Sequence, residues 1–134
     1  MNAKKISLAS VLLVIHALVT LGYGGALLAN PAGVAGYMGL AILSADGKAE
    51  LITMYLGMSG AVSLFMLYGA FSRKWRPQAA LFLAITMSGI ALGRGIGWLF
   101  LETDSYTLNA LFYDIPIALL SWAALVNLRK EPAA

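Results

Sequence analysis

Four long apolar runs restrict this chain to a membrane fold. They cover residues 6–28, 50–71, 77–101 and 108–128. A helix needs about 20 apolar residues to cross a bilayer, and only helices or closed barrels satisfy all their backbone hydrogen bonds there. The runs lack the alternation that barrel strands show. We therefore predict an all-α polytopic membrane protein, a bundle of four transmembrane helices that forms one integral membrane domain over residues 1–134.

The composition supports lipid as the solvent. The chain is 60% hydrophobic and 11% charged, whereas soluble domains carry roughly 25% charged residues. It has no cysteine and one histidine, His16, which argues against disulfides and metal sites. We expect His16 to be a buried neutral imidazole bonded to a neighbouring helix, with a ligand or proton-relay role as the alternative. The residues identify no cofactor, and the net charge of +3 indicates no nucleic-acid partner.

Basic residues predict the orientation of the chain. Seven of the nine flank the runs on one side of a four-span bundle: Lys4, Lys5, Arg73, Lys74, Arg76, Arg129 and Lys130. The other side carries Lys48 among acidic residues: Asp46, Glu102 and Asp104. Loops rich in lysine and arginine stay in the cytoplasm, so we expect both termini there.

Two further features bear on this threading. The basic N-terminus resembles a signal peptide, but its apolar run is too long and "ALLAN" is a poor cleavage site, so we expect a retained anchor. Tryptophan prefers the membrane interfaces. We place Trp75 and Trp122 near the inner interface and Trp98 near the outer one.

The segment between the first two runs, "NPAGVAGYMGLAIL", is apolar but interrupted by glycines. Asn30 followed by Pro31 is typical of a helix start, a cap and then a first turn. We expect a short helix at the outer interface; an apolar loop packed over the mouth of the bundle is the alternative. "SADGK" is then a turn leading into span two, which Glu50 opens.

Glycines recur every four residues in the third run, at Gly89, Gly93 and Gly97. This spacing places them on one helix face, where a second helix backbone can approach closely. We expect that face to pack inside the bundle, and a homodimer seam is the alternative.

Polar residues gather in the outer third of the spans. Arg94 lies about 10 Å and Asp114 about 9 Å from the outer ends of spans three and four, and Glu50 opens span two near the same surface. An arginine in hydrocarbon costs several kcal/mol unless it is paired or hydrated. We expect Arg94 to pair with Asp114, with Glu50 as a second carboxylate; snorkelling toward the headgroups is the alternative. The cluster is completed by polar side chains at similar depth: Tyr23, Tyr55, Asn109 and Tyr113.

Two stretches carry a resemblance to a known family. "AELITMYLGMSGA" in span two and "GIALGR" in span three resemble a family of small four-span bacterial inner-membrane proteins that is a domain of unknown function. Glu50, Tyr55 with Gly57, and Gly93 with Arg94 fit its pattern, although Leu56 stands where the family often has glycine. The resemblance covers residues 20 to 128. It implies a bacterial inner-membrane location and adds weight to Glu50 and Arg94, but it brings no activity.

The chain is also distantly similar, in size and span number, to DoxX-like membrane proteins, some of which are subunits of quinone-linked oxidoreductases. That likeness is one of fold alone.

Three classes of function fit these residues. The first is a non-catalytic module that holds a lipid headgroup, a small anionic ligand or a partner membrane subunit at Arg94. The second is a quinone-binding or other membrane enzyme subunit whose tyrosines line a headgroup site, although no nucleophile–base set is recognisable. The third is a proton-coupled transporter acting as a dimer, which the absence of an acidic residue in span one disfavours.

Overall fold

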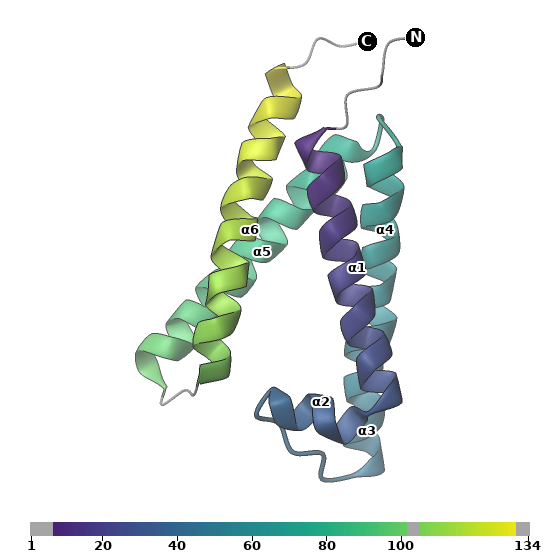
Figure 1. Ribbon diagram of the computed structural model, residues 1–134, viewed down its shortest axis with the longest axis vertical. Coiled ribbons are helices and arrows are strands. Elements are labelled where there is room, and N and C mark those ends of the chain that lie inside the picture. Colours follow the sequence, from purple (N-terminus) through teal and green to yellow (C-terminus); the bar gives the residue numbers. More distant parts are fainter. Residues whose placement is uncertain (1–6, 102–104, 131–134) are drawn as a thin grey trace. The chain divides into compact units, whose positions relative to one another are not determined.

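Helices account for all the regular structure in the part of the chain that the computed structural model describes, residues 7–101 and 105–130 without the side chains of 129 and 130. In chain order they are α1 (Leu8–Ala29), α2 (Pro31–Tyr37), α3 (Ala45–Ile52), the π-helix η1 (Thr53–Met58), α4 (Ser59–Phe71), α5 (Arg76–Phe100) and α6 (Ser105–Lys130) (Figure 1). Four stretches are long and apolar enough to span a membrane: Leu8–Ala29, Ala45–Phe71, Arg76–Phe100 and Ser105–Leu128. The predicted all-α fold with four long apolar helices is confirmed.

Some charges behind the predicted orientation lie outside the described residues. They are Lys4, Lys5, Glu102 and Asp104, together with the side chains of Arg129 and Lys130.

The predicted helix between the first two spans is α2. Asn30 caps it, because its side-chain Oδ1 accepts a hydrogen bond from the Gly33 N–H at 3.1 Å. Pro31 occupies the first turn, where its missing N–H costs nothing. The helix has seven residues, which is too few to cross a bilayer. Figure 1 shows α2 lying crosswise to α1 rather than along it.

Span two begins earlier than predicted. Ser44 caps α3, since its Oγ accepts a hydrogen bond from the Gly47 N–H at 3.0 Å. Asp46 follows in the first turn, where the helix dipole favours a negative charge. The predictions that "SADGK" is a turn and that Glu50 opens the span are therefore wrong. Glu50 lies in the second turn of α3, on an exposed face.

The chain forms two compact units, residues 1–14 with 66–134 and residues 15–65. The first unit is built on α5 and α6, which run antiparallel side by side (Figure 1). Its core residues recur every three or four positions, the spacing of one helix face. They are Ala79, Ala80, Leu83, Ala84 and Met87 of α5, and Leu111, Asp114, Ala118, Ser121 and Leu125 of α6.

A tight hairpin joins α4 to α5 in this unit. Gly69 packs so closely on α5 that a Cβ there would overlap the Cβ of Ala79. The Arg76 Nη2 donates a hydrogen bond to the carbonyl of Ala70 at 3.1 Å, and the Ser10 hydroxyl donates to the same carbonyl at 3.0 Å. These two donors satisfy a carbonyl at the end of α4 that has no partner within its helix.

In the second unit, α1 approaches the backbone of η1 through Gly24. A Cβ at Gly24 would lie 2.8 Å from the Tyr55 carbonyl oxygen and 3.3 Å from the Leu56 Cα. Real Cβ atoms do not come so close to backbone, so only glycine fits unless the helices separate. Gly24 therefore fixes the distance between α1 and the π-helical turn.

Replacing Gly24 with alanine should destabilise the protein by about 1–3 kcal/mol, the usual cost of overpacking a tight contact. Gly22→Ala and Gly25→Ala are matched controls on the same helix, because nothing lies within 4 Å of either added methyl. They should be neutral or stabilising, since alanine favours helix by up to about 1 kcal/mol. Thermal unfolding in a mild detergent checks this. Equal melting temperatures for all three variants would show that the contact does not set the packing.

Candidate functional site

An ion pair joins α5 to α6 in the half of the two helices that lies nearest the loop between them. The Arg94 Nε lies 2.7 Å from the Asp114 Oδ2. Arg94 is six residues from the end of α5 and Asp114 is nine residues from the start of α6. At 1.5 Å per residue, the pair sits roughly 9–14 Å inside the two spans. The predicted contact between these residues is confirmed.

The helical repeat explains why Asp114 points inward. On α6 it belongs to the row of buried residues that includes Leu111, Ala118 and Ser121, spaced at three and four positions. Its neighbour Pro116 lies within the helix and cannot donate a backbone hydrogen bond. Asp114 is therefore a buried acid on a face that is otherwise made of apolar and small residues.

Burial makes the contact strong. The Asp114 side chain is 7% exposed and that of Arg94 is 31% exposed. The two contacting atoms are inaccessible, and neither has a hydrogen-bond partner of good geometry among the described residues. A low-dielectric surrounding strengthens the attraction between their charges. Asp114 is almost fully buried, whereas about a third of the Arg94 side chain stays accessible.

Tyr106 is a site residue that the sequence analysis missed. The guanidinium carbon of Arg94 lies 5.4 Å from the centre of the Tyr106 ring, within the range of a cation–π interaction. Tyr106 precedes Tyr113 by seven residues, two helical turns, so both rings occur on one face of α6. That spacing could have indicated Tyr106, which precedes the expected start of span four at residue 108.

The other candidates on α6 have different positions. Tyr113, next to Asp114, is partly buried. Asn109 is exposed, and at five residues from Asp114 it lies about 140° around the helix. Asn109 is therefore not part of the ion-pair contact.

Three predicted site residues belong to the second unit. Glu50 lies on α3, Tyr55 in η1 and Tyr23 on α1. Gly24 brings the backbone of α1 against the Tyr55 carbonyl, so Tyr23 and Tyr55 occur beside the same close contact. Their part in a site with Arg94 stays a prediction.

The π-helical turn Thr53–Met58 is the local feature of span two that α-helical spacing does not anticipate. The Ser59 N–H bonds to the Met54 carbonyl five residues earlier, and the Ser59 hydroxyl donates to the same oxygen at 3.1 Å. Such turns are rare and frequently occur at functional sites. In an α-helix each residue turns by roughly 100° about the axis, which would put Glu50 and Tyr55 about 140° apart. The π-helical turn changes this rotation, so that angle does not apply.

A second polar contact holds α5 against α6 near mid-span. The Trp122 indole N–H donates to the Ser88 hydroxyl at 3.0 Å, and that hydroxyl donates to the Ala84 carbonyl at 2.8 Å. Ser88 is the middle residue of α5. The Trp122 indole thus has a partner within the helix pair, and its place near the inner interface stays a prediction.

The predicted packing face of α5 is open within its own unit. Among the residues described there, nothing lies within 4 Å of a Cβ built on Gly89, Gly93 or Gly97. Their role in helix packing stays a prediction. The described residues contain no group of three or more His, Asp or Glu side chains that could hold a metal ion.

Comparison with known protein families gives one match. The model of a family described as a domain of unknown function (DUF4345) matches residues 8–125, which include all four spans. No curated protein and no solved structure matches the chain.

Proposed function

Because the chain belongs to DUF4345, a domain of unknown function, we propose its role from the site itself. The protein is a non-catalytic membrane module that holds an anionic group, from a lipid headgroup or a small acidic ligand, at Arg94. One observation carries this proposal: the Arg94 guanidinium is partly accessible, and its Nε contacts the buried carboxylate of Asp114.

The geometry of the guanidinium supports this role. An arginine has five N–H donors in a planar fork, which suits carboxylate and phosphate groups. The contact with Asp114 uses the Nε edge, so the four N–H groups on the two Nη atoms can serve a ligand. Asp114 offsets the cost of keeping a cation in the membrane while the site is empty. The Tyr106 ring limits the directions in which the guanidinium can turn.

The residues around Arg94 suit binding better than catalysis. Asp114 is engaged by a cation that cannot deprotonate, and a carboxylate held in this way is a poor general base. Tyr106 and Tyr113 add aromatic surface and phenol groups, which hold a headgroup in place. The sequence places Glu50, Tyr55 and Tyr23 at a similar depth in their spans, and their part in binding stays a prediction.

Ligand retention tests the proposal through Arg94→Lys. Lysine keeps the charge that pairs with Asp114, so the variant should fold, but it lacks the planar fork. Losing a hydrogen bond to a charged group costs about 1.5–3 kcal/mol, so retention should fall roughly 10- to 100-fold. Native mass spectrometry of protein purified in mild detergent measures the retained ligand. Arg76→Lys, the same change at the other end of α5, is the matched control and should retain it.

Three outcomes would contradict the proposal. One is wild-type protein that carries no acidic ligand, and another is Arg94→Lys protein that retains the ligand as well as Arg76→Lys does. A retained quinone in place of an acidic group would instead favour a quinone-linked enzyme subunit.

We also propose that the protein is a single domain of the bacterial inner membrane with both termini in the cytoplasm. One family match spans both compact units, which supports a single domain. A chain that crosses the membrane with all four candidate spans has the α4–α5 turn, with Arg73 and Lys74, on the same side as its two ends, which supports this orientation. Basic loops remain in the cytoplasm.

A C-terminal reporter fusion should therefore be active only in its cytoplasmic form. Fusions after Leu43 and after Leu101, in the two loops of the other side, serve as the controls and should give the opposite result. Activity of the C-terminal fusion outside the cytoplasm would contradict the four-span threading.

A further inference from the structure

The turn between α4 and α5, Ser72–Arg76, carries three basic residues in a fixed backbone. The N–H groups of Trp75 and Arg76 both donate to the Ser72 carbonyl, at 3.2 Å and 2.9 Å. The turn joins two membrane spans, so it emerges at the level of the lipid headgroups. Arg73, Lys74 and Arg76 are therefore held together at the membrane surface.

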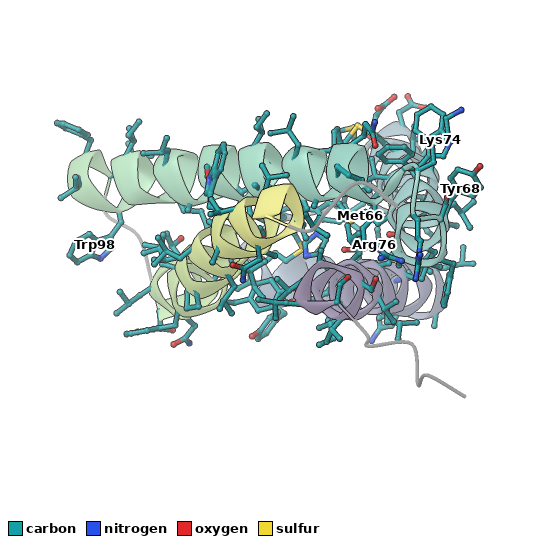
Figure 2. The ribbon with its side chains drawn as sticks, turned by 90° about the horizontal axis from the view of Figure 1, so that it is seen from above. Met66, Tyr68, Lys74, Arg76 and Trp98 are labelled. Carbon is teal, nitrogen blue, oxygen red and sulfur yellow. The ribbon has the colours of Figure 1, made fainter. Side chains whose placement is uncertain are left out.

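The three cations have different surroundings. Arg76 is turned inward, where its Nη2 donates to the Ala70 carbonyl and its Nε is buried. Arg73 and Lys74 are exposed. Figure 2 shows Arg76 beside α1 and α4, whereas Lys74 lies at the outer edge of the hairpin. Arg76 thus stabilises the end of α4. Arg73 and Lys74 are exposed and can contact a molecule outside the protein.

No acid among the described residues of this unit pairs with Arg73 or Lys74. Asp114 is the only acidic side chain described there, and it is paired with Arg94. Arg94 is 18 residues from Arg76 along α5, roughly 27 Å away. The described part of the unit therefore leaves Arg73 and Lys74 without a countercharge.

Exposed aromatic side chains flank the two cations along the chain. Tyr68 and Trp75 stack with ring centres 6.3 Å apart and planes tilted by 51°. Both rings are exposed, and Phe71 beside them is 80% exposed. Aromatic rings of this kind favour the boundary between headgroups and acyl chains. The surface combines a positive centre with an apolar margin. It is complementary to a phospholipid, whose negative phosphate lies next to its apolar acyl chains.

We propose that Ser72–Arg76 is a binding site for an anionic phospholipid. The lipid phosphate lies between Arg73 and Lys74, at the positive end of the α5 dipole. The part of the acyl chains nearest the headgroup lies against Phe71 and Trp75. This site is independent of the one at Arg94, which lies in the other half of the span.

Lipid retention in nanodiscs tests the proposal. Full-length protein is placed in phosphatidylcholine mixed with phosphatidylglycerol, and native mass spectrometry counts the lipids that stay bound. Losing a hydrogen bond to a charged phosphate weakens binding roughly 10-fold or more, so Arg73→Gln/Lys74→Gln should lower the preference for phosphatidylglycerol by at least about 10-fold. Arg129→Gln/Lys130→Gln removes two charges from the same side of the membrane and is the matched control, which should keep most of the preference.

Other arms separate this site from its alternatives. The loss caused by Arg73→Gln/Lys74→Gln should be the same in wild-type and in Arg94→Lys protein, so failure here and failure of the Arg94 proposal are distinguishable. Added inorganic phosphate should not displace the lipid. An unchanged preference in Arg73→Gln/Lys74→Gln, an equal loss in the control, a loss that disappears in the Arg94→Lys background, or displacement by phosphate would each overturn the proposal.

Discussion

An arginine in the apolar part of a membrane must have a countercharge or reach water, because it cannot lose its proton. In this protein Asp114 supplies that countercharge at 2.7 Å. The contact joins α5 to α6, and the Trp122–Ser88 hydrogen bond joins the same helices nearer mid-span. Lipid gives no hydrophobic force between helices, so polar contacts and close packing must hold them. The arginine that would otherwise weaken span three thus becomes part of what holds the helix pair.

Close packing at glycines holds other helices together. Gly69 lets α4 meet α5 at Ala79, and Gly24 lets α1 meet the backbone of η1. Neither glycine belongs to the regular Gly89, Gly93, Gly97 series. A contact of this kind depends on what faces the glycine, which its spacing along one helix does not reveal. The spacing of Gly89, Gly93 and Gly97 therefore did not indicate which glycines make close contacts within each unit.

The spans, the α2 helix and the Arg94–Asp114 pair were predictable because each follows from a strong local rule. Membrane length sets the spans, Asn30 and Pro31 start α2, and a charge in lipid needs a partner at equal depth. The contacts of Tyr106 and Trp122 were not predicted, because they depend on the rotation of α6 against α5. The π-helical turn in span two also escaped, since no local signal distinguishes it from α-helix. Glu50 was misplaced because the Ser44 cap extends span two by a turn and a half.

The central claim is that Arg94 and Asp114 stabilise the fold as a pair, and a double-mutant cycle measures this directly. The free energies of unfolding are compared for wild type, Arg94→Leu, Asp114→Leu and the double variant in one detergent. Each single change should cost about 3 kcal/mol, the low end for breaking a buried pair, because Arg94 is about one-third exposed. The double variant should recover much of that loss, since neither charge is then stranded. Additive losses, or single variants as stable as wild type, would show that Arg94 does not depend on Asp114 and would contradict the account.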